Sequence, residues 1–347
     1  MTGVQTCALP IYLNRPNLQV ITGAHTTRIL LEKKRAVGVE YQQDGLVKQI
    51  KANREVLLCA GALQSPQILM LSGIGAHKHL LANGIATQHD LPGVGQHLHD
   101  HVDVVQVVDT PGLMDLFGLS WAGAWQKLGD IREWRNHRTG RLTTNFAEAG
   151  AFFRSQPGEP APDLQLHFVI GKLVNHGRKT VFGHGYSCHV CLLHPKSRGS
   201  VRLASADPLA TPLIDPGFFA DPDDMLRLVD GFKRMRQILT QPALAALGGR
   251  ELASSAGAQS DAQIEAFIRA NADTIYHPVG SCRMGPGPGD VVDAELRVHG
   301  VQGLRVVDAS IMPSIVGGNT NAPTIMIAER AADLIRADAR QSQLMAA

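Results

Sequence analysis

A continuous apolar run, followed by a glycine and a helix-forming segment, limits most strongly what this chain can fold into. Residues Glu55-Val-Leu-Leu-Cys-Ala60 show no alternation of apolar and polar side chains, which is typical of a strand buried on both faces of a sheet. Gly61 follows, and Pro66 suits the first turn of a helix that Ser72-Gly73 would end. A strand, a glycine and a helix in this order can bring backbone amides to a sheet edge where ligands bind. Most segments of this kind, however, are ordinary α/β packing without a ligand.

The segments before this run have the composition of β-strands. Asp44-Gly45 is a hairpin signal between two of the apolar stretches. We therefore expect residues 14–58 to be β-structure, with three short strands ahead of the buried one: residues 17–22, 26–31 and 36–41.

Residues 102–272 have a different pattern. Only one stretch, residues 111–140, is long enough to hold substantial helix, and it contains the three tryptophans of the chain. An antiparallel sheet is therefore favoured over parallel βαβ units. Two helices should follow, one starting at Asp221-Pro222 and one behind a capping box formed by Ser260 and Gln263. The expected strands are residues 149–153, 163–169, 186–193 and 199–203.

The composition limits which functions are open to the chain. Its 347 residues carry a net charge of only +2 and no basic block, so nucleic-acid binding is not expected. No apolar run is long enough for a transmembrane helix. The cysteines are odd in number and widely scattered, which favours a reducing, cytoplasmic location. Peripheral attachment to a membrane stays open.

Two local patterns are compatible with metal binding. His97, His99 and His101 would share one face of a strand. Cys188 and Cys191 have CxxC spacing, but they would point to opposite faces of a strand and no second CxxC accompanies them. We therefore favour hydrogen-bonded or buried roles for these side chains and expect no metal site.

The segment from His277 to Ala328 carries the clearest chemical pattern. A histidine of near-neutral pKa, such as His277, can accept a proton from an alcohol as its carbon gives up a hydride. Asn321 can donate a hydrogen bond to the alcohol oxygen without competing for that proton. Asp308 ends a short apolar strand, and a helix begins near Pro323 with unpaired amides. A lone histidine is more often structural, so these neighbours decide the interpretation.

Three separated segments resemble the glucose–methanol–choline (GMC) oxidoreductase family. Residues 61–75 (GALQSPQILMLSGIG) match its second signature, residues 91–101 (LPGVGQHLHDH) are similar to its next block, and residues 277–285 (HPVGSCRMG) to its C-terminal block. The resemblance extends from residue 12 to residue 335 and keeps the family's order. It implies a mixed α+β and α/β fold, in which an incomplete, Rossmann-like FAD-binding domain joins a substrate domain whose antiparallel sheet is flanked by helices.

The resemblance also implies a division of the chain. Residues 1–11 would be a leader outside the family. The other parts would be residues 12–95 in the FAD domain, 96–273 in the substrate-binding domain, 274–340 in a return to the FAD domain that carries the catalytic residues, and 341–347 in a tail.

By the same resemblance, His277 corresponds to the family's catalytic histidine, and Asn321 to a position that holds either histidine or asparagine. The positive end of the helix near Pro323 would suit the negative charge on a reduced flavin. Asp308 would lie near the ribityl chain and diphosphate of FAD, and Thr26 near the adenine. The full set expected to bind FAD is Thr26, Ala60, Gly61, Asp308, Ala309, Ala322 and Pro323.

The implied activity is FAD-dependent oxidation of an alcohol, with His277 removing the hydroxyl proton as hydride passes to flavin N5. The electron acceptor would be a quinone or another carrier, and residues 184–201 look most like bacterial alcohol or choline dehydrogenases. A cyanohydrin lyase on the same scaffold, or a catalytically inert fragment, are the alternatives.

One family motif does not occur in the sequence. Gly73-Ile-Gly75 and Gly93-Val-Gly95 both lack the third glycine of the Gly-x-Gly-x-x-Gly turn that cradles the FAD pyrophosphate. We therefore expect this chain to be the C-terminal part of a flavoenzyme, with weak FAD binding and little activity alone.

Overall fold

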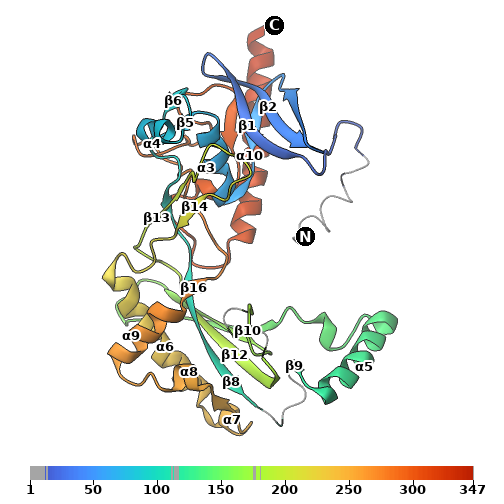
Figure 1. Cartoon of the computed structure of the whole chain (residues 1–347), viewed down its shortest axis with the longest axis vertical. Coiled ribbons are helices and arrows are strands. Elements are labelled where there is room, and N and C mark those ends of the chain that lie inside the picture. Colours follow the sequence, from blue (N-terminus) through green and yellow to red (C-terminus); the bar gives the residue numbers. More distant parts are fainter. Residues whose placement is uncertain are drawn as a thin grey trace.

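The computed structural model describes residues 12, 15–110, 112, 117–174, 177–179 and 181–346, so the predicted leader lies outside the described part. Figure 1 shows two lobes stacked along the long axis of the molecule, with β16 at their junction. Each lobe has its own hydrophobic core. The first core draws on residues 29–94 and 279–331 together with Leu203, and the second on residues 102–268. The predicted domain boundaries stay a prediction, and Leu203, which they assign to residues 96–273, packs in the first core.

The first lobe begins with an antiparallel meander of β1 (His25–Glu32), β2 (Arg35–Gln43) and β3 (Leu46–Lys51). Asp44 and Gly45 both have positive φ, at 53° and 75°, which is the backbone of a type I′ turn. The predicted hairpin is therefore confirmed. The predicted strand at residues 17–22 is wrong, because those residues find no partner strand among the described residues and leave Leu18 and Val20 exposed.

The predicted strand–glycine–helix unit is confirmed. β4 (Val56–Leu58) pairs in parallel with β17 (Leu304–Val306), and α3 (Gly61–Leu71) follows β4 directly. Val56 and Leu58 are buried, but Leu57 is 45% exposed, so burial on both faces was predicted wrongly. Among the described residues this parallel sheet has only two strands.

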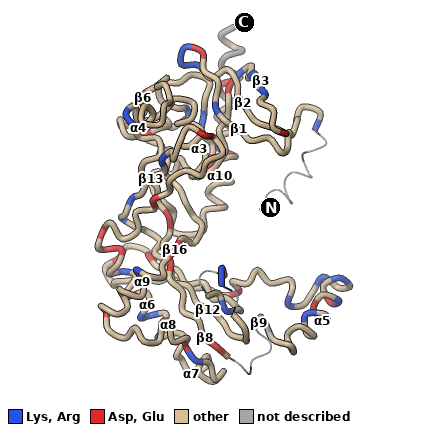
Figure 2. Tube along the Cα trace, viewed as in Figure 1, with Lys and Arg blue, Asp and Glu red and all other residues tan. Residues whose placement is uncertain are grey.

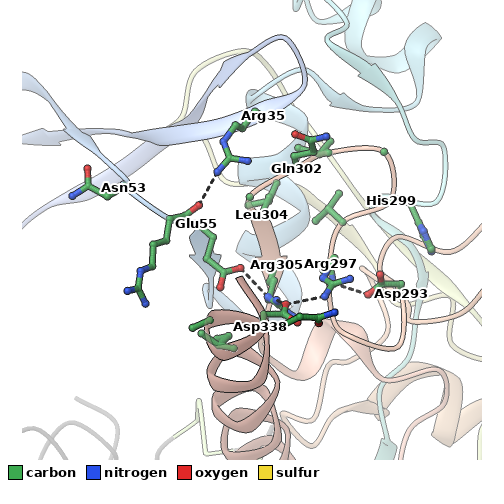
Figure 3. Close-up of a pocket in the computed structure, with 18 residues that line it drawn as sticks. Arg35, Asn53, Glu55, Asp293, Arg297, His299, Gln302, Leu304, Arg305 and Asp338 are labelled. Carbon is green, nitrogen blue, oxygen red and sulfur yellow. Dashed lines mark hydrogen bonds and ion pairs between the residues drawn. The ribbon is translucent and has the colours of Figure 1, made fainter. Parts of the chain in front are cut away.

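Arg305 joins this small sheet to the C-terminal helix α10 (Asn321–Ala346), which includes residues 341–346 of the predicted tail. The side chain is 3% exposed. Its Nε donates to Glu55 at 2.8 Å, and its two Nη atoms donate to the Glu295 carbonyl and to Asp338 of α10. Figure 3 shows this ion-pair cluster, which lines a pocket of about 970 Å³.

The second lobe is built on the predicted antiparallel sheet. Its strands run in the order β10-β11-β12-β8-β15, with β16 on β8 and β9 on β12, and every pairing is antiparallel. The strands are β8 (Val102–Asp109), β9 (Gly118–Leu119), β10 (Ala147–Phe153), β11 (Leu164–Val169), β12 (Gly183–Leu192), β15 (Arg250–Glu251) and β16 (Asp273–Thr274).

Helices cover one face of this sheet. In α6 (Pro222–Leu239) the predicted stripe of Met225, Val229, Phe232, Met235 and Leu239 is buried, and Asp221 caps the helix. α9 (Asp261–Asn271) has the predicted capping box. Two short helices, α7 (Pro242–Ala245) and α8 (Ala253–Ala256), complete this layer. The predicted helical stretch contains α5 (Trp121–His137), which extends away from the sheet (Figure 1).

Several short elements complete the fold. The predicted strand at residues 199–203 forms, but as part of a separate three-stranded sheet in the order β14-β13-β7. The remaining elements are β5 (Ile74–Gly75), α4 (His77–Ala82), β6 (His89–Asp90), β7 (Gln96–Leu98), η1 (Arg141–Thr143), β13 (Gly199–Arg202), β14 (Leu213–Asp215) and η2 (Ala309–Ile311).

Candidate active site

Two of the sequence blocks meet where the lobes join. His99 and Val279 exchange both backbone hydrogen bonds, each 2.9 Å long, although 180 positions separate them. Gly280 follows with φ at +86°, and a Cβ there would lie 2.6 Å from the His97 carbonyl oxygen. Only glycine fits this backbone position without displacing its neighbour. The pairing therefore places His101 beside His277.

Asp100 holds the backbone that presents His277. Its Oδ1 accepts the His277 amide at 3.0 Å, and its Oδ2 accepts the Thr274 hydroxyl. Burial raises the pKa of Asp100 to about 6. Tyr276, between these two partners, has φ at +68°, a left-handed conformation that is strained for a bulky residue. The loop is thus fixed by hydrogen bonds in a conformation it would not adopt alone.

The His101 side chain determines which nitrogen of His277 carries a proton. His101 Nε2 lies 3.0 Å from the carbonyl oxygens of both Leu193 and Val316. Carbonyl oxygens only accept hydrogen bonds, so His101 Nε2 must carry the proton. Its Nδ1 is then an acceptor, and it lies 3.0 Å from His277 Nδ1. His277 must therefore donate from Nδ1, which leaves its Nε2 with a free lone pair.

Both histidines are neutral near pH 7. Burial lowers the pKa of His101 to about 3, and burial also lowers the pKa of His277. The two rings meet edge to face, with centroids 5.1 Å apart and planes at 88°. A neutral imidazole whose Nε2 lone pair is free is the state that a proton acceptor needs.

The structure brings Asn319, and not Asn321, to His277. Asn319 Nδ2 lies 3.4 Å from His277 Nε2, and Asn319 Oδ1 accepts from Gln165 Nε2 at 3.5 Å. This amide orientation matches the tautomer deduced for His277, because Nδ2 can only donate. Asn321 is the first residue of α10, and no hydrogen bond to His277 is found for it in the described part of the chain. The two asparagines are only two positions apart in a polar segment of the sequence, so spacing alone did not distinguish them.

One face of the second sheet adds polar side chains near this pair. On β11, Gln165 contacts Asn319, and the ring of His167 is buried enough to lower its pKa to about 4. On the neighbouring strands His189 Nδ1 and Asp103 Oδ2 lie 2.6 Å apart. Sequence reasoning missed these residues, although Gln165 and His167 alternate with apolar neighbours and so mark a polar strand face.

The side chains of the two patterns that were compatible with metal binding have hydrogen-bonded or buried positions in the structure. His99 is buried and its Nδ1 accepts the Ile315 amide at 3.3 Å. Cys188 and Cys191 are buried on β12. Among the residues that the structure describes, no group of three or more metal-ligating side chains is found. None of the described helices is both long and apolar enough to cross a membrane.

The predicted FAD-binding residues form two groups. Thr26 and Ala60 line the same pocket of about 180 Å³. Asp308 accepts hydrogen bonds from the Gly61 amide at 2.9 Å, from the Ser310 amide at 2.8 Å and from the Ser65 hydroxyl. Both carboxylate oxygens are thus already engaged within the protein. Asp308 therefore fixes the junction of β17, β4 and α3, rather than offering a free oxygen to a ligand.

These residues fit an extended, anionic cofactor such as FAD. η2, which contains Ala309, contacts both α3 and α10, and the first amide of α3, that of Gly61, donates to Asp308 immediately before η2. Helix N-termini attract negative charge. Gly61 has φ at +84°, and a Cβ added there would meet nothing within 4 Å. Open space therefore borders the start of α3. Ala322 and Pro323 form the first turn of α10.

The fold and the site together define a class of flavin-dependent oxidoreductase. Two family models, both described as GMC oxidoreductase, match residues 2–103 and 195–328. Together they cover well over half of the chain. The chain belongs to the GMC oxidoreductase family, whose members are FAD-dependent flavoproteins.

Two relatives show how far the similarity extends. The chain is 46% identical over 325 residues to the alcohol dehydrogenase [acceptor] of Pseudomonas putida, covering 93% of this chain and 59% of that protein. It is 44% identical to an oxygen-dependent choline dehydrogenase of Paraburkholderia xenovorans, covering 93% and 57%. The chain thus spans less than two thirds of the length of the curated relatives it matches.

Solved structures show the same fold. An FAD-dependent oxidoreductase from Chaetomium thermophilum superposes with a TM-score of 0.83 at 26% identity, covering 97% of this chain and 64% of that one. A formate oxidase from Aspergillus oryzae superposes with a TM-score of 0.87 at 26% identity, covering 95% and 63%.

Proposed function

We propose that this protein oxidises an alcohol with FAD, and that His277 Nε2 removes the hydroxyl proton. The observation that carries this proposal is the hydrogen-bond chain from the Leu193 and Val316 carbonyls through His101 to His277. It leaves Nε2 of a neutral imidazole unprotonated at the junction of the lobes, and among the described residues this atom accepts only the long hydrogen bond from Asn319.

The residues of this chain would act in a defined order. Asn319 Nδ2 donates to the alcohol oxygen and holds it beside His277 Nε2. His277 then accepts the hydroxyl proton and becomes an imidazolium. Its Nδ1–H still points at the His101 lone pair, and the dipoles of two carbonyl groups stand behind His101. This arrangement stabilises the positive charge in a buried site.

FAD, when bound, supplies the acceptor for the hydride that leaves the alcohol carbon. Thr26 and Ala60 would hold its adenine end. The amides at the start of α3 and α10, from Gly61, Ala322 and Pro323, would face its negatively charged parts. Asp308 would act indirectly, by fixing the start of α3. Asn321 would contribute only its backbone, at the N-terminus of α10. Asn319 would donate the hydrogen bond to the substrate.

The names of the relatives support oxidation over cyanohydrin cleavage. Those named above are dehydrogenases and an oxidase. The acceptor is a quinone or another carrier in this proposal, since the Pseudomonas putida relative is named only for an unspecified acceptor. The oxygen-dependent relative makes molecular oxygen the alternative to test.

A chimera tests the proposal. The N-terminal segment of the Pseudomonas putida relative would be joined to residues 12–347, and the purified protein supplied with FAD. We expect reduction of a dye acceptor that depends on added alcohol. Cleavage of a cyanohydrin without dye reduction would replace the proposal with a lyase. A chimera that binds FAD but turns over neither substrate would favour an inert chain.

We also predict that the 347-residue chain alone retains far less than an equimolar amount of FAD. Its described parallel sheet has two strands, and its sequence has no Gly-x-Gly-x-x-Gly turn for the pyrophosphate. The measurement is the flavin absorbance that stays with the protein after desalting. Equimolar retention would show that the residues assigned above suffice to hold the cofactor.

The pH dependence of stability should report the buried His101. Its pKa is about 6.5 when unfolded and about 3 when folded, so the unfolded state binds more protons between these values. The free energy of unfolding should therefore be greatest above about pH 6.5 and fall as the pH drops. Asp100, with its raised pKa, acts in the opposite direction between about pH 4 and 6.

Urea denaturation at several pH values checks this expectation. In His101→Gln the loss of stability between pH 6 and 5 should be smaller by about 1.4 kcal/mol per pH unit than in the wild type. His137→Gln, an exposed histidine at the end of α5, is the matched control and should leave the slope unchanged. Equal slopes in all three proteins would contradict the burial of a neutral His101.

A further inference from the structure

Helix α5 turns its apolar face away from the protein. Trp121, Trp125 and Leu128 follow at helical spacing, so they share one face. They are 92%, 77% and 60% exposed. Phe182, which precedes Gly183, is also 80% exposed, and Gly183 pairs with Leu119 just before the helix. A surface helix of a globular protein normally buries such a stripe.

The opposite, polar face attaches the helix to the protein. Asp130 is 9% exposed and receives both Nε and Nη2 of Arg141, at 3.2 and 2.7 Å. Ser120 caps the first turn by accepting from the Gly123 amide, and its hydroxyl also lies 2.8 Å from His184 Nε2. The helix is therefore held in this orientation by specific contacts, with its apolar face outward.

Basic residues continue the outward face. Arg132 lies one turn beyond Leu128 and Arg135 lies two turns beyond it, and both are exposed. The Arg138 guanidinium lies 4.3 Å from the Trp134 ring. Figure 2 shows how positive charge predominates along α5. Of the two acids, Asp130 is already paired with Arg141, so the exposed face is aromatic at one end and cationic at the other.

We propose that α5 docks on an anionic lipid surface. Trp121, Trp125 and Leu128 would enter the boundary between headgroups and acyl chains, while Arg132 and Arg135 would meet lipid phosphates. Tryptophan and arginine are the side chains that suit this boundary, since each combines an apolar body with a polar tip. The inference goes beyond the proposed alcohol oxidation and does not depend on it.

A bilayer fits this face better than a folded partner. α5 has 17 residues and is therefore about 25 Å long, enough to lie along a membrane but, with its charges, unsuited to cross one. It projects from the edge of the sheet as a single ridge (Figure 1), and its main contacts in the chain are with β9 and η1. A deformable lipid surface accommodates a ridge, and the arginines complement its negative charge.

The tryptophans make the test specific. All three tryptophans of the chain lie on α5, so intrinsic tryptophan fluorescence reports on this helix alone. The chain would be mixed with phosphatidylcholine vesicles that contain phosphatidylglycerol, and with vesicles of phosphatidylcholine alone. We expect the emission to shift to shorter wavelength, and the protein to sediment, with the anionic vesicles.

Three variants separate the contributions. Trp121→Ser with Trp125→Ser should weaken partitioning on the order of tenfold or more, as should Arg132→Glu with Arg135→Glu. Trp134→Phe, which leaves the outward face intact, should bind as the wild type does. The exchanged side chains are exposed, and circular dichroism would confirm that the fold is retained.

Several results would overturn the proposal. One is a protein that stays in the supernatant with unchanged fluorescence in the presence of anionic vesicles. Another is equal binding by the wild type and the Trp121→Ser, Trp125→Ser variant. A fluorescence shift that grows with protein concentration in the absence of lipid would identify a second copy of this chain as the occupant instead. None of these outcomes bears on His277, because the assay needs neither FAD nor alcohol.

Discussion

His277→Ala should lower alcohol-dependent dye reduction in the chimera by about 10²–10⁴-fold, the usual contribution of a positioned general base. The variant removes the only nitrogen whose free lone pair follows from the hydrogen-bond chain through His101. Binding of FAD should be unaffected, because none of the residues proposed to hold it is altered. The rate of dye reduction and the retained flavin absorbance would be measured on the same samples.

Two controls sharpen this result. His137→Ala removes an exposed histidine remote from the site and should leave the rate unchanged. Asn319→Ala should cost about 10²-fold, in the range of other removed donors, whereas Asn321→Ala should cost much less. Full activity in His277→Ala would remove the base from the proposal, and a larger loss in Asn321→Ala would restore the assignment made from the sequence.

Asp308→Ala should lower the free energy of unfolding by about 3 kcal/mol or more, even without FAD. The carboxylate is 6% exposed and accepts from two backbone amides and one hydroxyl. Removing it leaves those donors buried and unsatisfied. Urea denaturation of the 347-residue chain measures the loss directly.

The matched variants are Ser65→Ala and Asp333→Ala. The first removes only one of the three donors and should cost about 1 kcal/mol. The second removes an acid whose side chain is 65% exposed, and such a change should stay within about 0.5 kcal/mol. If Asp308→Ala is as stable as the wild type, its importance lies with the cofactor rather than with the fold, as the sequence resemblance first implied.

Local signals predicted much of the fold. The apolar run before Gly61, the Asp44-Gly45 hairpin and the apolar stripe of α6 each depend on neighbouring residues, and each is found in the structure. Residues 17–22 had an acceptable strand composition but find no partner strand in the part of the chain that the structure describes. Strand formation depends on such a partner, which composition does not reveal.

The site was predictable only in part. The sequence indicated the block around His277, but the side chains that the structure places beside His277 come from positions far away in the chain. His101 lies 176 positions before His277, and its orientation is set by the carbonyls of Leu193 and Val316. Such a contact follows from the pairing of His99 with Val279, which is a tertiary event. The choice between Asn319 and Asn321 likewise depended on where α10 begins.

The outward orientation of the apolar face of α5 could not be predicted from the sequence either. Residues 111–140 were expected to hold helix, and an apolar stripe in a surface helix is normally buried. In the structure the Asp130–Arg141 pair holds the polar side inward, so the apolar side faces out.

The tautomer of His277 is the most direct test of the proposed base. In a chain labelled with ¹⁵N, the imidazole nitrogen shifts and their couplings to the ring protons distinguish a protonated from an unprotonated nitrogen. At neutral pH we expect His277 to carry its proton on Nδ1 and to have an unprotonated Nε2, with the reverse pattern in His101. A proton on His277 Nε2 would contradict the hydrogen-bond chain and, with it, the assignment of this atom as the base.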